Sequence, residues 1–183
     1  MKRWIIMGTG LVVVLTLGWE MKLSMADEDE YWERTQDVAA VTNPVYKEEC
    51  GSCHMAYPPG LLPGRSWEKM MATLEDHFGE NAELESGIAA ELTRFLVENS
   101  ADASSNYRRS RKIMRDLPDE SAPLRITELG YFRHEHQEIP ARLITANPKV
   151  NSLSNCNACH QKAELGSFSE REIYIPGYGK WDD

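Results

Sequence analysis

The sequence has 183 residues, of which 42% are hydrophobic, and more acidic than basic side chains, with a formal charge of −9. This length allows one medium domain or two very small ones. The acidic balance argues against a nucleic-acid-binding protein, which needs a basic face to neutralise phosphates, and it favours partners with cationic surfaces.

The first 26 residues have the organisation of a secretory signal. Lys2 and Arg3 precede an uncharged run from Trp4 to Trp19, and the small residues Ser24 and Ala26 follow shortly after it. We therefore predict export to the periplasm, with cleavage between Ala26 and Asp27. The run is shorter than the roughly 20 residues that span a bilayer. We expect a mature protein that is not embedded in the membrane, and an uncleaved anchor is the alternative.

Three helices are predicted in the first half of the chain. One runs from about Asn43 into the motif "CGSCH" at 50–54. Apolar residues at helical spacing then predict a helix from Ser66, as its N-cap, through Phe78, and another helix that Asn81 caps. The polar segment "NSADASSN" at 99–106 predicts a domain boundary. We assign residues 27–104 to an N-terminal domain and 105–183 to a C-terminal domain.

The second half of the chain shows weaker periodicity. The segment "YRRSRKIMRDL" at 107–117 carries a basic cluster, which is either a solvated connector or a set of arginines that binds carboxylates or a partner. Thr127 is predicted to cap a short helix through "ELGYFRHEHQEI". The motif "CNACH" follows at 156–160, and the tail after it shows at most one short extended piece. The predicted fold class is therefore mainly α.

All four cysteines of the sequence belong to the two CxxCH motifs. Within each motif two thiols can add to the vinyl groups of one haem, and the next histidine lies under the iron, a pattern typical of c-type haem attachment. Zinc binding and a redox dithiol are the alternatives. Zinc would need further ligands close to each cysteine pair. We expect two covalently bound haem c groups, with Cys50, Cys53, Cys156 and Cys159 as thioethers and His54 and His160 as proximal iron ligands.

The remaining histidines are candidates for the opposite faces of the two irons. His77 lies on the apolar stripe of its predicted helix, with Met70 or Met71 as competing ligands. His134 and His136 precede the second motif, and only one of them can face a given iron because two helical positions differ by about 200°. We expect His77 and His136 as distal ligands, with His134 as the alternative to His136. A vacant site at the second iron and a crossed arrangement, with His77 on the second haem, stay open.

The segments "CGSCHMAYPPGLLPGRSW", "HFGENAEL", "RITELGYFRHEHQEI" and "NCNACHQKAELGSFSEREIYIP" resemble the bacterial dihaem cytochrome c family. The resemblance implies two small haem-centred domains, the first similar to a class I cytochrome c and the second short and irregular. It also implies two bis-histidine haems and electron transfer in the periplasm. Its implied partners are redox proteins, in some members a small high-spin cytochrome c and a membrane cytochrome b.

Carried over by position, the resemblance assigns His54 and His160 as proximal ligands and His77 and His136 as distal ligands. His134 is an addition to the family pattern. Arg125 in "RIT" is a candidate contact for a haem propionate. We expect aromatic side chains to line the haem sites: Trp67, Phe78 and Tyr57 at the first haem, and Tyr131 or Phe132 at the second. We expect an electron carrier and not an enzyme. The alternative is a haem enzyme, such as a peroxidase-like protein, or a gas sensor with one open iron.

Overall fold

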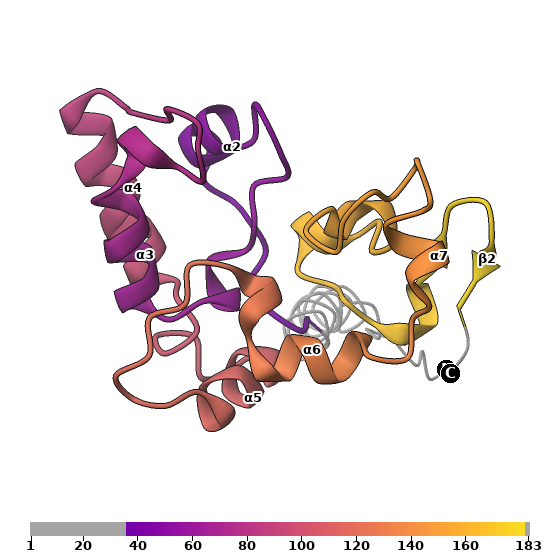
Figure 1. Ribbon diagram of the computed structural model, residues 1–183. Helices are drawn as coiled ribbons and strands as arrows, with labels where there is room; N and C mark the ends of the chain where they lie inside the picture. Colours follow the sequence, from indigo (N-terminus) through magenta and orange to yellow (C-terminus); the bar gives the residue numbers. More distant parts are fainter. Residues whose placement is uncertain (1–35, 182–183) are drawn as a thin grey trace, which may run out of the picture. The chain divides into compact units, whose positions relative to one another are not determined.

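The computed structural model of the chain describes residues 36–181, so the predicted signal at 1–26 lies outside the described residues. The helices of this part are α2 (Pro44–Cys50), α3 (Gly64–Met71), α4 (Ser86–Glu98), α5 (Arg108–Asp116), α6 (Gly130–His136) and α7 (Ala141–Ile144) (Figure 1). A hairpin of two short strands, β1 (Tyr174–Ile175) and β2 (Gly179–Lys180), follows them. The prediction of a mainly α fold is confirmed. Between residues 36 and 181, no helix combines the length and apolarity needed to cross a bilayer.

Helix α2 begins where the sequence predicts. The Asn43 side chain accepts a hydrogen bond from the Tyr46 amide at 3.0 Å, and Pro44 occupies the first helical position, where its missing N–H costs nothing. The buried Tyr46 anchors the helix by donating from its hydroxyl to the Tyr57 carbonyl oxygen at 2.8 Å. The helix ends at Cys50, so its packing positions the first CxxCH motif.

Helix α3 differs from the predicted helix at both ends. It begins after Pro63, so Ser66 lies inside the helix and is not its cap. It ends at Met71, and a separate 3₁₀ turn, Leu74–Asp76, follows. His77 comes directly after that turn. The prediction that His77 lies on a continuous helix is therefore wrong, although the side chain is still half-buried.

Helix α4 is capped by Glu85, whose carboxylate accepts hydrogen bonds from the amides of Gly87 and Ile88 at 2.9 and 3.3 Å. The prediction of Asn81 as the cap is wrong, because the Asn81 side chain accepts from the Glu83 amide at 2.8 Å in a local turn. Leu92 and Leu96 are buried. Figure 1 shows α4 beside α3, and these two helices make the most extensive helix–helix contact in the described part of the chain.

Helices α5 and α6 connect the two CxxCH regions. On α5, Ser110 is buried and donates from its hydroxyl to the Gly60 carbonyl oxygen at 2.9 Å. Helix α6 packs against α5. It begins after Leu129, because residues Ile126–Glu128 form a 3₁₀ turn of their own. The predicted cap, Thr127, therefore lies in that turn and not at the start of α6.

The segment at 37–41 is held by the chain that follows the second motif. The amides of Asp37 and Val38 donate to the Gly166 carbonyl oxygen at 3.0 and 3.2 Å, and the Val41 amide donates to the Glu164 carbonyl oxygen at 3.0 Å. Gly166 has φ +79°, and a Cβ built there would lie 2.2 Å from the Val38 carbonyl oxygen. This position therefore requires glycine.

Two hydrophobic clusters form the core of the described residues. The larger one includes Val38, Trp67, Leu92 and Ile113, and it continues to Phe168 near the end of the chain. The smaller one contains Leu143, Ile144, Val150 and Ile175 beside the hairpin. The larger cluster contains residues from both sides of the predicted boundary after residue 104. The division into domains at 27–104 and 105–183 stays a prediction.

Candidate functional site

Four histidines form two facing pairs. The ring centroids of His54 and His77 are 6.2 Å apart, with 27° between the ring planes. Those of His136 and His160 are also 6.2 Å apart, with an angle of 73°. Two imidazoles that share one metal ion through bonds of about 2 Å have centroids roughly 6 Å apart. Both pairs therefore have the separation of two ligands on opposite faces of one iron.

Hydrogen bonds orient one imidazole of each pair. The Nδ1 atom of His54 lies 2.8 Å from the Met55 carbonyl oxygen, and the Nδ1 atom of His136 lies 2.8 Å from the Phe132 carbonyl oxygen. A carbonyl oxygen only accepts, so Nδ1 carries the proton in each ring. The lone pair of Nε2 is then free to bind a metal, the usual arrangement for a ligating histidine.

The first centre is the more open of the two. His54 and Cys53 are exposed, whereas Cys50 at the end of α2 is partly buried. His77 is held in its turn by backbone hydrogen bonds to Glu80 in both directions, at 2.8 and 3.3 Å. Burial is the main cause of the lowered pKa of His77, which His54 and Arg125 lower further. The lowered pKa favours the neutral imidazole, the form that binds iron.

The second centre lines a cavity of about 270 Å³ whose walls are largely apolar. His136, His160, Cys156 and Cys159 all lie on this cavity, so two thiols and two imidazoles converge on an apolar space, the donor set that a covalently held haem needs. The ring of Phe132 stacks on His136 at 3.9 Å. Burial, followed by His136, lowers the pKa of His160 to about 4, so this imidazole is neutral near pH 7.

His134 lies on α6 like His136 and also lines the cavity, but its surroundings differ. Its side chain is exposed, and its Nδ1 atom lies 3.3 Å from the side-chain nitrogen Nε2 of Gln137. A two-residue offset places the two rings on different faces of the helix. Of these two histidines, His136 is the one that faces His160.

No disulfide joins any of the four cysteines. Burial raises the pKa of Cys50 and of Cys156 to about 11 in each case, so both are protonated at neutral pH. Cys156 begins a 3₁₀ turn, Cys156–Ala158, which Cys159 ends. No group of three or more His, Cys, Asp and Glu side chains within residues 36–181 is arranged to hold a free metal ion.

The aromatic residues expected near the haems have distinct surroundings. Trp67 is buried, and its indole N–H donates to the Pro59 carbonyl oxygen at 2.8 Å. The Phe78 ring lies 4.8 Å from the His77 ring and is 45% exposed, with a backbone φ of +60°. The exposed Arg125 places its guanidinium 3.9 Å from the Phe78 ring centroid. The predicted propionate contact of Arg125 stays a prediction.

Tyr57 connects the two centres. Its ring centroid lies 4.9 Å from that of His54. Its hydroxyl donates to the Ser154 carbonyl oxygen at 2.7 Å, two residues before Cys156. Tyr57 therefore contacts the histidine of one motif and the backbone that leads into the other.

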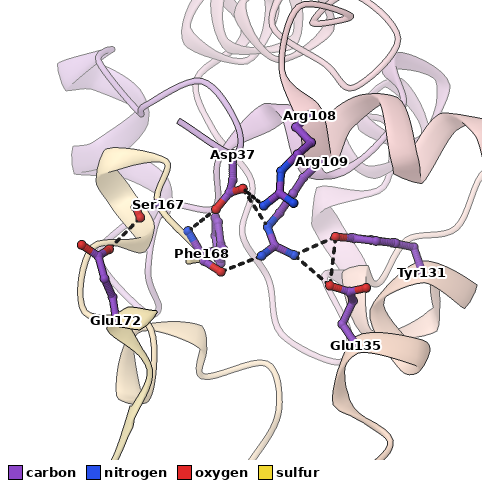
Figure 2. Close-up of polar contacts among 8 residues, drawn as sticks. All are labelled: Asp37, Arg108, Arg109, Tyr131, Glu135, Ser167, Phe168 and Glu172. Atoms are coloured by element: carbon purple, nitrogen blue, oxygen red, sulfur yellow. Dashed lines mark hydrogen bonds and ion pairs between the residues drawn. The ribbon is translucent and has the colours of Figure 1, made fainter. Parts of the chain in front are cut away.

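A buried ion-pair cluster lies beside the second centre (Figure 2). Arg109 is 8% exposed, and its guanidinium donates to the Phe168 carbonyl oxygen at 2.6 Å, to the Tyr131 hydroxyl at 2.7 Å and to Glu135 at 3.2 Å. Its Nε atom lies 3.3 Å from Asp37, within ion-pair distance but without hydrogen-bond geometry.

Arg108 and the Phe168 amide complete the cluster by donating to Asp37 at 2.7 and 2.9 Å. The expectation of a solvated connector is wrong for Arg109, because protein groups surround it. The alternative, that arginines of this segment pair with haem propionates or dock a partner, stays a prediction. Sequence reasoning missed Asp37 and Glu135 altogether. One signal was present, since Arg109 lies one helical turn before the buried Ile113 and so shares its face.

Comparison with known proteins gives consistent matches. The family model described as "Dihaem cytochrome c" matches residues 46–168. The solved structure of a diheme cytochrome c from Shewanella baltica OS155 is 41% identical, with a TM-score of 0.64 over 76% of this chain and 98% of that chain. A diheme cytochrome c from Rhodobacter sphaeroides is 43% identical, with a TM-score of 0.64 over 72% of this chain and 100% of that chain. Comparison with curated proteins found no match.

Proposed function

The chain belongs to the dihaem cytochrome c family, and we propose that it passes single electrons between protein partners through two haems with a histidine on each face of the iron. Membership of this family implies two haem c groups and haem-based electron transfer. Each haem c supplies an iron that cycles between the ferric and ferrous states by one electron.

The proposed ligands follow the motifs and the facing pairs. Cys50 and Cys53 hold the first haem, and Cys156 and Cys159 hold the second. His54 and His77 ligate the first iron, and His160 and His136 the second. The observation that carries this proposal is the common ring-centroid distance of 6.2 Å in both histidine pairs.

The histidine pairs favour an electron carrier over an enzyme. An iron with an imidazole on both faces has no vacant position for a substrate or a gas, and its coordination stays the same in both oxidation states. His54 and His136 support this role because their backbone hydrogen bonds restrict ring rotation. A haem enzyme or gas sensor would instead need one open iron.

We further propose that the protein works in the periplasm after removal of residues 1–26. The acidic composition, with a formal charge of −9, favours partners with cationic docking faces. A small high-spin cytochrome c and a membrane cytochrome b are the partner types that the family resemblance implies.

The proposal is tested with the exported, haem-loaded protein by optical and electron paramagnetic resonance spectra, before and after reduction and after exposure to carbon monoxide. Two low-spin haems that lack a methionine–iron band and do not bind carbon monoxide are expected. A high-spin signal or carbon monoxide binding at one haem would contradict bis-histidine ligation at that iron and would favour the enzyme or sensor alternative.

A further inference from the structure

Two side chains of opposite charge that pair with each other face the cavity of the second centre, which the exposed Glu138 and Glu170 also line. Arg109 and Glu135 both line the cavity that contains His136 and His160. They lie 3.2 Å apart, and their side chains are 9% and 24% exposed. Asp37 and Arg108, the other charged members of the cluster, do not line this cavity. Arg109 and Glu135 are therefore the charged members of the cluster that lie on the wall of this cavity.

Both groups lie close to the histidines of this centre. Glu135 directly precedes His136 on α6, and the cavity that Arg109 and Glu135 line is the one that contains His136 and His160. Neither charge is needed to bind haem in the proposed ligand set, so another reason is needed for an ion pair at this buried position.

Charge near an iron changes its reduction potential. Reduction of the ferric iron by one electron lowers the positive charge of the haem by one. A nearby cation favours the reduced state, and a nearby anion favours the oxidised state. The effect is larger in a buried site, because the low effective dielectric constant weakens screening.

We propose that Arg109 and Glu135 form a pair that sets the reduction potential of the second haem, Arg109 raising it and Glu135 lowering it. Both are positioning and electrostatic residues and do not ligate iron. The remaining contacts of Arg109, to Tyr131 and to Phe168, hold the guanidinium at the cavity wall. This inference rests on the proposed electron-transfer function.

The test is a redox titration of the haem-loaded protein, with dithionite as reductant and ferricyanide as oxidant, for the variants Arg109→Gln and Glu135→Gln. Arg109→Gln is expected to lower the midpoint potential of one haem and Glu135→Gln to raise that of the same haem, while the other haem moves little. His136→Met, which replaces an imidazole by a thioether, marks the second haem by a raised potential.

Two further variants separate charge from structure. Arg109→Lys keeps the charge and should retain most of the potential, even if its lost hydrogen bonds lower stability. Arg133→Gln is the matched control, because Arg133 is exposed on the same helix as Glu135 and does not line the cavity. It should leave both potentials nearly unchanged.

The outcomes are distinct. Opposite shifts at the second haem support the proposal. Unchanged potentials, shifts of the same sign, or an equal shift in Arg133→Gln would overturn it. If Arg109→Gln does not fold, the direction of the shift in Glu135→Gln decides alone. Low-spin spectra and inertness to carbon monoxide, recorded for the same samples, test the electron-carrier function separately.

Discussion

His136 faces His160 at a ring-centroid distance of 6.2 Å, while His134, two residues earlier on α6, is exposed. Replacing His136 by Ala should therefore open the second iron. We expect one of the two haems to become high-spin and to bind carbon monoxide. His134→Ala is the matched control and should leave both haems low-spin. Carbon monoxide binding by His134→Ala, and none by His136→Ala, would show that His134 and not His136 ligates the second iron.

His77 should ligate the first iron, since its ring lies 6.2 Å from that of His54. A variant that carries Cys156→Ala and Cys159→Ala should retain only the first haem, as measured by mass. If its spectrum stays low-spin, adding His77→Ala should open that haem to carbon monoxide, whereas adding His136→Ala should not. The reverse result would support the crossed arrangement.

Asp37 should link stability to pH. Burial, its largest single influence, raises the pKa of Asp37, but Arg109, Arg108 and the Phe168 amide together outweigh it, so the pKa lies below the usual 3.8. A lowered pKa means that the ionised form stabilises the fold above about pH 4, and that this stability is lost as the pH falls towards the lowered value.

Asp37→Asn should therefore lose about 3 kcal/mol at pH 7, and its stability should fall less steeply with acid. Denaturant unfolding of the haem-loaded protein at several pH values measures both effects. Asp116→Asn, in the exposed pair with Arg115, is the control and should change stability little. Equal effects of the two substitutions would contradict the importance of burial.

Gly166 should tolerate no side chain. Ala at this position would combine a φ of +79° with a Cβ 2.2 Å from the Val38 carbonyl oxygen, which should cost about 3 kcal/mol or more of unfolding free energy. Gly130→Ala is the comparison, because a Cβ there meets nothing within 4 Å. It should be neutral or slightly stabilising. Similar stabilities of the two variants would show that the 37–41 segment can shift.

The local rules predicted some elements well. Asn43 and Pro44 carry a capping signal that depends only on neighbouring residues, and α2 begins there. The prediction of one helix through His77 was wrong because apolar periodicity does not distinguish a continuous helix from a helix followed by a 3₁₀ turn. Leu74 is partly buried in that turn, so the apolar spacing continues after the helix has ended.

The ion-pair cluster could not be predicted by rules that use only neighbouring residues in the sequence. Asp37 lies far from Arg109 in the sequence, and their contact depends on how the chain after the second motif packs on residues 37–41. The prediction for the histidine of each CxxCH motif depends only on adjacent residues, and it stays a prediction. For His136, expected from the sequence with His134 as the alternative, the structure adds the direction in which each side chain leaves α6.

The hydrogen bonds between residues 37–41 and 164–166 have a consequence for the order in which the protein matures. A ribosome makes the first of these segments early and the second near the end. The early segment therefore lacks these hydrogen-bond partners until almost the whole chain exists. Both CxxCH motifs are synthesised before that point. All four cysteines have therefore been synthesised before the 37–41 segment can form these hydrogen bonds.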